Sequence, residues 1–192
     1  MVGFTGFASR RRADPALPPG QYLEKGFPVL ATGPDPQIKR WELRIATENG
    51  AKSLSWDDFL ALPQETIATD IHCVTSWSKL GTNWRGVSLD TLFDGLETTH
   101  EFAMARSYGG YTTNLPLADL LGGKAWIVHE FEGEPLRSEH GGPARLFVPH
   151  LYFWKSAKWV QGIQTMPVNT PGFWEGLGYH AHGDPWKEER YS

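Results

Sequence analysis

The chain has 192 residues, of which 40% are hydrophobic and 21% charged, values that suit one globular domain with its own core. Its net charge of -4 gives no sign of a nucleic-acid partner, and no stretch approaches the roughly 18 apolar residues of a membrane-spanning helix. The single cysteine, Cys73, excludes an intrachain disulfide, a four-cysteine iron–sulfur cluster and a cysteine-rich zinc site.

The first 40 residues are rich in proline, glycine and charge, and they predict an extended arm that lies across the domain. Only residues 27–30 are apolar enough for this arm to be packed there. Residues 9–12 read Ser-Arg-Arg-Arg, which invites a twin-arginine export interpretation. Because no apolar region follows them, we interpret them as a solvated basic arm. A cytoplasmic location is expected, or a periplasmic one if a leader has been removed.

Two elements follow the arm. Residues 41–46 alternate apolar and polar side chains, the pattern of a half-buried strand. Ser55 with Asp58 three positions later predicts the N-terminus of a short helix, which Pro63 ends.

The rest of the chain predicts further strands and one more short helix. Residues 66–74 form a β-branched run that carries Cys73 near its end, and Ser88 caps a helix around residues 92–93. More strands are predicted over residues 102–105, 126–129, 145–148 and 159–163. Together these elements indicate an α+β fold dominated by sheet, in one domain over residues 1–192 with a C-terminal tail over residues 170–192.

Cys73 lies where a strand gives way to a polar, aromatic-lined loop, in the segment Asp-Ile-His-Cys-Val-Thr-Ser-Trp at residues 70–77. A thiolate is a soft ligand that suits a transition metal, whereas a lone cysteine is more often a small buried hydrophobe. A third interpretation is a nucleophile activated by a histidine. His72 is poorly placed for that role because adjacent residues on a strand point to opposite faces.

A second segment, residues 139–158, combines glycines with basic residues. Gly141 and Gly142 would let a bound group approach the backbone, and Arg145 offers a planar fork for phosphate. Lys155 and Lys158 add point charges, and backbone N–H groups at 156–158 could complete an anion cradle. The alternative is a plain Gly-Pro turn with solvated bases. Three aromatic residues around these charges favour a walled pocket: Phe153, Trp154 and Trp159.

The C-terminal tail contains His180 and His182, a spacing found among zinc ligands. No third ligand is evident nearby, so a packed tail is favoured over a metal site or a wall of the active-site entrance. Three further histidines are interpreted as structural: His100, His129 and His150.

The two chemistry-bearing segments together resemble the molybdopterin-binding domain of the sulfite oxidase family, including the bacterial methionine-sulfoxide-reductase-type subunits. The likeness is carried by His-Cys-Val-Thr-Ser-Trp at 72–77 and Trp-Arg-Gly-Val at 84–87. It continues in His-Gly-Gly-Pro-Ala-Arg at 140–145 and Lys-Ser-Ala-Lys-Trp-Val at 155–160. Their order and spacing fit over roughly residues 20 to 170.

The resemblance implies the sulfite-oxidase molybdopterin-domain fold, with mixed β-sheets, short helices and many loops, and a molybdenum–molybdopterin cofactor. Cys73 is then the catalytic residue and the protein's ligand to the metal. The residues implied to hold the pterin and its phosphate are Ser107, His140, Arg145, Ser156, Ala157 and Lys158. The arm around Phe27 is a further candidate contact without a matched position. Of the arginines that hold the substrate anion in family sulfite oxidases, only Arg145 can be matched, while Arg85, Arg106 and residues 10–12 have no assigned position.

The implied function is two-electron oxygen-atom transfer on a small sulfite- or sulfoxide-like substrate. Because the chain shows no second redox centre, electrons are expected to pass to or from a separate partner, a cytochrome or a membrane haem or quinone protein. Two alternatives remain at this point: a Cys73-dependent hydrolase or transferase, and a non-catalytic binding module with a vestigial pterin pocket.

Overall fold

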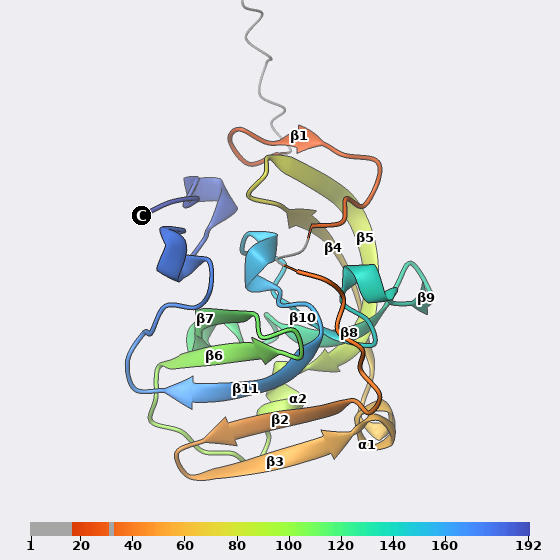
Figure 1. The fold of residues 1–192 in the computed structure, drawn as a ribbon, viewed down its shortest axis with the longest axis vertical. Coiled ribbons are helices and arrows are strands. Elements are labelled where there is room, and N and C mark those ends of the chain that lie inside the picture. The colour runs from red at the N-terminus through yellow and green to blue at the C-terminus, as the bar shows by residue number, and fades with distance from the viewer. Residues whose placement is uncertain (1–16, 31–32) are drawn as a thin grey trace, which may run out of the picture.

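The computed structural model describes residues 17–30 and 33–192, which form two β-sheets with short helices between the strands (Figure 1). Residues 9–12, and with them the export interpretation, lie outside the described part. The six-stranded sheet contains β1 (Tyr22–Leu23), β4 (Glu65–His72), β5 (Trp77–Ser88), β8 (Trp126–Phe131), β9 (Glu134–Pro135) and β10 (Arg145–Phe147). The five-stranded sheet has the order β3 (Gly50–Ser55), β2 (Glu42–Thr47), β11 (Val160–Met166), β6 (Phe102–Ser107) and β7 (Thr112–Pro116).

Each sheet mixes parallel and antiparallel pairs. The β1–β5 and β2–β11 pairs are parallel, and the other pairs are antiparallel. The helices are α1 (Trp56–Ala61), α2 (Leu89–Phe93) and the 3₁₀ turns η1 (Leu117–Asp119), η2 (Ser138–His140), η3 (Phe153–Lys155), η4 (Glu175–Leu177) and η5 (Pro185–Lys187). This is the α+β fold with mixed sheets that the sequence predicted. No helix among the described residues is long and apolar enough to cross a membrane.

Both predicted helix starts are confirmed. The Ser55 side chain accepts a hydrogen bond from the Asp58 N–H, and the Asp58 carboxylate accepts one from the Ser55 N–H, which is a complete capping box. The helix α1 ends at Ala61, with Leu62 as its C-cap directly before Pro63. Ser88 caps α2 by accepting from the Asp90 N–H.

Some boundaries differ from the sequence-based expectation. The strand β4 ends at His72, so Cys73 lies in the turn that follows it, and β11 begins at Val160 because Trp159 has a positive φ of 51°. In the arm, Val29 and Leu30 are exposed, whereas a packed segment was expected there.

The longest strand, β5, was not predicted, although the family likeness singled out residues 84–87 within it without assigning them a secondary structure. It contains Gly81, Asn83 and Gly86, residue types that are depleted in strands. Hydrogen bonding to neighbouring strands compensates for this low strand propensity, since β5 pairs with β1, β4 and β8. Local propensity was therefore overridden by tertiary pairing.

The main hydrophobic core lies between the two sheets and is formed by residues of both, among them Leu43, Ile45, Val87, Leu92, Ile127, Leu146 and Ile163. A smaller cluster contains Ile71, Cys73, Trp77, Trp84, Val128, Leu136 and Phe147. The turn that carries Cys73 thus borders the second cluster, near the described arm and the tail (Figure 1).

Candidate cofactor site

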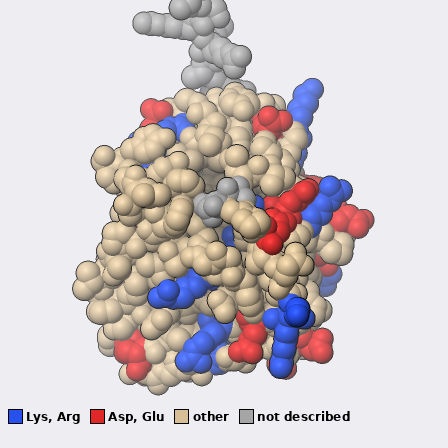
Figure 2. Space-filling view, viewed as in Figure 1, with Lys and Arg blue, Asp and Glu red and all other residues tan. Residues whose placement is uncertain are grey.

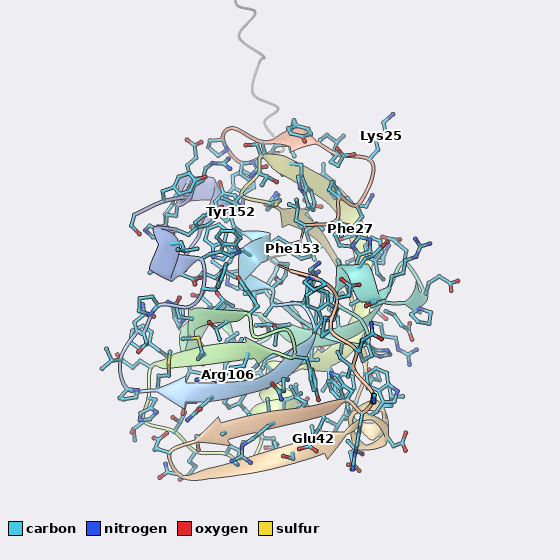
Figure 3. All side chains as sticks on the ribbon, viewed as in Figure 1. Lys25, Phe27, Glu42, Arg106, Tyr152 and Phe153 are labelled. Carbon is cyan, nitrogen blue, oxygen red and sulfur yellow. The ribbon has the colours of Figure 1, made fainter. Side chains whose placement is uncertain are left out.

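A cavity of about 340 Å³ brings the two chemistry-bearing segments together. Its polar lining includes Cys73, Tyr111, His140, Arg145, Ser156 and Lys158. Its aromatic lining includes Phe27, Trp77, Phe153, Trp154, Trp159, Trp174 and Tyr179. In Figure 3 the labelled Phe27 of the arm and Phe153 of η3 lie close together, and their ring centroids are 5.9 Å apart. The walled pocket predicted around the basic segment is confirmed.

A tight turn presents Cys73 to this cavity. The Cys73 N–H donates to the Trp77 carbonyl at 2.8 Å, and the Ser76 N–H donates to the Cys73 carbonyl at 3.0 Å. Ser76 has a φ of 76°, in the left-handed region that reverses the chain. From the arm, the Gln21 side-chain amide donates to the same Cys73 carbonyl at 3.0 Å. The backbone around the thiol is therefore held from two sides.

The environment of the thiol does not suit a nucleophile. Cys73 is buried, and this burial raises the pKa of its thiol above the usual value. Its Sγ contacts the Thr75 hydroxyl at 3.1 Å, and among the described residues no histidine bonds to it. His72 instead pairs through Nδ1 with the Ser78 hydroxyl at 2.8 Å. A coordinated metal would deprotonate such a thiol directly, without a base.

Arg145 is a buried cation without a carboxylate partner. Its guanidinium donates to the carbonyls of His140, at 2.8 Å, and Ser156, and its Cζ lies 4.0 Å from the Phe153 ring centroid. No described acid forms an ion pair with it, and its Nε has no hydrogen-bond partner. Burial lowers the pKa of Arg145 to about 9. A buried charge in this condition is costly unless an anion joins it.

Lys158 lies on the same wall. Its Nζ donates to the Glu139 carbonyl at 2.7 Å and sits 4.6 Å from the centroid of Trp159. Burial, and next the positive charge of Arg145, lower the pKa of Lys158 to about 8. Arg145 is close enough for its charge to lower the pKa of Lys158, and two neighbouring cations form a binding site for phosphate.

The glycines of the basic segment serve the chain itself and not a bound group, contrary to expectation. A Cβ on Gly142 would meet the Leu136 carbonyl oxygen at 1.9 Å, and one on Gly141 would meet the Lys158 Cβ at 2.8 Å. Gly141 also has a φ of 105°, which disfavours any side chain. The two glycines let the loop after η2 pass closely under Leu136 and Lys158.

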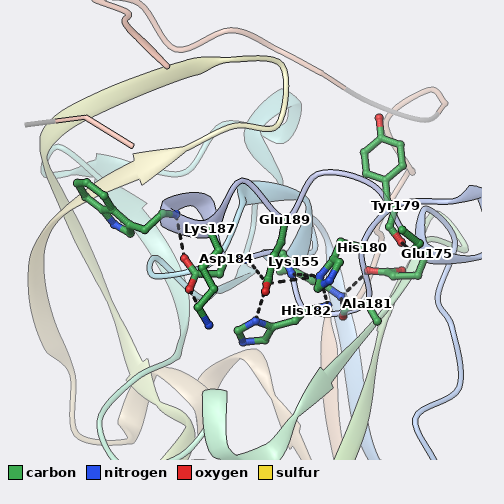
Figure 4. Close-up of polar contacts among 12 residues, drawn as sticks. Lys155, Glu175, Tyr179, His180, Ala181, His182, Asp184, Lys187 and Glu189 are labelled. Carbon is green, nitrogen blue, oxygen red and sulfur yellow. Dashed lines mark hydrogen bonds and ion pairs between the residues drawn. The ribbon is translucent and has the colours of Figure 1, made fainter. Parts of the chain in front are cut away.

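Lys155 corrects another expectation. This side chain is fully buried and turns away from the cavity toward the tail, where its Nζ bonds Glu175 at 2.6 Å and the Ala181 carbonyl at 2.6 Å (Figure 4). It also donates to the Asn114 carbonyl at 2.8 Å. Its charge is neutralised by Glu175, so it is not a free point charge for phosphate.

The predicted cofactor residues divide into two groups. Cys73, His140, Arg145, Ser156 and Lys158 line one cavity. Ser107 and Ala157 are not among its lining residues. Ala157 packs in the main core, and Ser107 is buried with a hydroxyl that has no partner. The roles of all seven toward the cofactor stay predictions.

The tail histidines bond to carboxylates. His182 lies between Glu189, 2.8 Å from Nδ1, and Asp119, 3.1 Å from Nε2 (Figure 4 shows the Glu189 contact). His180 Nδ1 lies 3.4 Å from the same Glu189. Within the described residues no set of three histidine, cysteine or acidic side chains has an arrangement that could hold a metal ion. The packed-tail interpretation fits these contacts. The other histidines also have structural partners: His100 with Thr165, His129 with Gln64, and His150 with Asp119.

Several site residues escaped the sequence analysis. Phe27, named there only as a candidate, stacks on His140 with 3.9 Å between ring centroids. Tyr111, Trp174 and Tyr179 also line the cavity and come from segments far from Cys73 in the chain. The one signal for them in the sequence is its high aromatic content, nine Trp, ten Phe and six Tyr, which does not say which aromatic residues meet.

Most of the chain matches a known protein family. The family model described as the oxidoreductase molybdopterin binding domain matches residues 31–174. The chain belongs to this family. It is 41% identical to an uncharacterized oxidoreductase, YuiH, of Bacillus subtilis strain 168, over 97% of this chain and 98% of that protein.

More distant relatives are longer than this chain. It is 27% identical to the putative protein-methionine-sulfoxide reductase subunit YedZ1 of Azospira oryzae, over 66% of this chain and 49% of that protein. It is 23% identical to human mitochondrial sulfite oxidase, over 76% of this chain and 32% of that protein. The sulfane dehydrogenase SoxCD of Paracoccus pantotrophus has a similar fold, with a TM-score of 0.60 and 19% identity over 67% of this chain and 38% of that chain.

The family establishes a molybdopterin-dependent oxidoreductase of the sulfite oxidase type, with molybdenum–molybdopterin as its cofactor. The cavity fits that cofactor. Its lining contains a soft sulfur ligand, Cys73, as a metal requires, and a buried Arg145 whose Nε lacks a partner among the described residues, as suits a phosphate. The hydrolase and vestigial-pocket alternatives have no comparable support.

Proposed function

We propose that this oxidoreductase catalyses two-electron oxygen-atom transfer on a small substrate at a molybdenum centre bound by Cys73, and exchanges electrons with a separate protein. The observation that carries the proposal is the shared cavity. In it the only cysteine of the chain faces the same space as a buried arginine, Arg145, which has no counter-anion among the described residues.

The chain's own residues bind and orient the cofactor. Cys73 supplies the protein's sulfur ligand. Arg145 and Lys158 neutralise the pterin phosphate, and His140, fixed by its stack on Phe27, is placed to donate to the pterin. When bound, the cofactor supplies oxygen-atom transfer coupled to two electrons. In the oxidising direction, substrate and water yield the oxygenated substrate, two protons and two electrons, and the reducing direction is the reverse.

The walls of the cavity favour an uncharged substrate over sulfite. The described lining of the cavity contains one arginine, Arg145, and one lysine, Lys158. Both are assigned to the pterin phosphate. The two arginines left unassigned by the sequence lie elsewhere: Arg85 pairs with Glu130, and Arg106 lines a groove on the five-stranded sheet. An aromatic enclosure suits a small sulfoxide or thioether. A relative's name, that of a methionine-sulfoxide reductase subunit, agrees with this choice.

The substrate proposal is tested by rate constants. A small neutral sulfoxide should be turned over with a kcat/KM at least tenfold above the value for sulfite oxidation, each measured with a suitable dye. A higher kcat/KM for sulfite would contradict the uncharged-substrate proposal and leave the oxidoreductase assignment intact.

The Cys73→Ser variant tests the metal ligand. The variant should fold and keep most of its pterin, because Arg145 and Lys158 remain, while turnover is abolished. Elemental analysis should give about one molybdenum per wild-type chain, and oxidation should release a fluorescent pterin. Full activity of the variant would refute the ligand assignment.

The same samples discriminate the alternatives. A colourless wild-type protein that alkylating agents inactivate would support the hydrolase. Wild-type protein free of metal and pterin, expressed in a cofactor-competent host, would support the binding module.

A further inference from the structure

A second hollow lies outside the cofactor site, on the outer face of the five-stranded sheet. This groove of about 490 Å³ is lined by Arg40, Arg44, Arg106, Glu42, Tyr108 and Gln161, with further residues of β2 and β11. We call it the arginine groove. Figure 3 labels Arg106 and Glu42 on this face of the molecule.

Strand register builds the groove. Gly162 of the central strand β11 is paired with Arg44 of β2 on one side and with Arg106 of β6 on the other. Because neighbouring strands are about 4.8 Å apart, the two arginine backbones stand about 10 Å apart with no side chain between them. Both arginines are exposed, so their guanidinium groups border a floor that is bare backbone at Gly162.

The groove is positive although the protein as a whole is negative. Arg40, Arg44 and Arg106 form no ion pair within the described residues, and Glu42 is the single acid in the lining. Lys and Arg side chains can be seen on this face in the space-filling view (Figure 2). With a net charge of -4 for the whole chain, such a local excess of positive charge selects an anionic partner surface.

The groove is continuous with the wall of the cofactor cavity. Trp159 lines the cavity, and its carbonyl accepts a hydrogen bond at 2.9 Å from the N–H of Tyr108, which lines the groove. Two residues further along the chain, Gln161 lines the groove. A partner seated in the groove would therefore contact Tyr108, whose backbone is bonded directly to a residue of the cavity wall.

We propose that the arginine groove docks the acidic face of a separate electron-transfer protein. The inference rests on the proposed function, which requires such a partner. Electron-transfer encounters are weak and bury under about 1,200 Å², and complementary charge steers them, so a small polar groove next to the cofactor suits one. Two electrons pass between partner and enzyme in each turnover, and the accompanying protons are exchanged with water.

A charge-reversal series tests the docking. The probe is a flavodoxin with a strongly negative net charge, and its binding to the purified holoenzyme is measured by calorimetry at about 20 mM and about 300 mM salt. We expect binding that weakens as salt rises, because the Debye length shortens. We expect an affinity loss of about tenfold or more in Arg44→Glu/Arg106→Glu. The conservative Arg44→Lys/Arg106→Lys variant should retain most of the affinity.

Matched variants and a second readout make the test specific. Arg106→Glu is compared with Arg85→Glu, which makes the same charge change on a strand of the other sheet. Reduction of the enzyme by reduced flavodoxin should slow only in the groove variants, while reduction by reduced methyl viologen, a small cation that donates one electron per molecule, should not slow in any of them.

The outcomes are distinct. Absence of flavodoxin binding to wild type, equal losses in Arg85→Glu and Arg106→Glu, or tight binding of inorganic phosphate without flavodoxin binding would each overturn the docking proposal. Molybdenum content of the same samples tests the proposed function separately, because the binding measurement does not depend on turnover.

Discussion

Among the residues of the site, Arg145 is the most informative about its chemistry. In a folded protein a fully buried guanidinium usually has an acid beside it. Here its partners are two carbonyls and an aromatic face, and one N–H has none. The arginine therefore lowers the stability of the cofactor-free protein and raises its affinity for an anion.

Replacing Arg145 with Met should separate these two effects. Each charge-assisted hydrogen bond to phosphate is worth about 1.5–3 kcal/mol, so retention of pterin and molybdenum should fall about tenfold or more. The thermal midpoint of the cofactor-free variant should be unchanged or higher, because the desolvation cost of the buried charge is removed. Arg85→Met, on the surface, is the control for both measurements. Full cofactor retention in Arg145→Met would remove this residue from the phosphate seat.

At the scale of elements, a buried ion pair ties the tail to the body of the protein. Lys155 at the end of η3 and Glu175 at the start of η4 are almost fully buried, and the carboxylate also accepts from Thr113 and Trp154. Trp154 of η3 and Trp174, the residue before η4, line the cavity. The ion pair therefore fixes the two segments that carry Trp154 and Trp174 to each other.

The Lys155→Met substitution should destabilise the protein by about 3–5 kcal/mol, because it leaves Glu175 buried without its counter-charge. The double variant Lys155→Met/Glu175→Gln should recover most of that loss, since the amide oxygen can still accept from Thr113 and Trp154. Denaturant unfolding measures both variants, with the exposed Lys187→Met as a control expected within about 0.5 kcal/mol of wild type. Additive losses in the double variant would contradict the pairing.

At the scale of the whole molecule, Glu48 joins segments that are far apart in the sequence: the turn after β2, the loop before β6, and β11. At the turn after β2, its carboxylate accepts from the Thr99 N–H at 2.6 Å and from the Thr98 hydroxyl at 2.7 Å, and it lies 3.3 Å from the Thr165 hydroxyl of β11. The Thr99 N–H is the main reason that the pKa of Glu48 is lowered to about 2.

This shift predicts how stability depends on pH. A carboxylate with a lowered folded-state pKa stabilises the protein above its unfolded value of 4.5, and this contribution is lost as pH falls from about 4.5 to about 2. Wild type should therefore exceed Glu48→Gln in free energy of unfolding at pH 7, and the difference should shrink across that window. Glu134→Gln, on the exposed strand β9, is the charge-matched control. A constant difference from pH 7 to pH 2 would exclude a contribution from ionised Glu48.

The sequence by itself determined what depends on local chemistry. Ser55 with Asp58, and Ser88, predicted both helix starts, because capping involves residues three or fewer positions apart. The alternating pattern of residues 41–46 predicted β2, because it too is visible in residues that are neighbours along the chain. Two segments in family order were enough to indicate the cofactor and Cys73 as its ligand.

Only the tertiary structure decided matters that depend on contacts between distant segments. It turned Lys155 toward Glu175, filled the space beside Gly141 and Gly142 with the chain itself, and stacked Phe27 on His140. It also set Arg44 and Arg106 on either side of Gly162, a register that no local pattern contains. A residue's type states which bonds its side chain can make, but the fold chooses the partner, because partners that are neighbours in space are far apart along the chain.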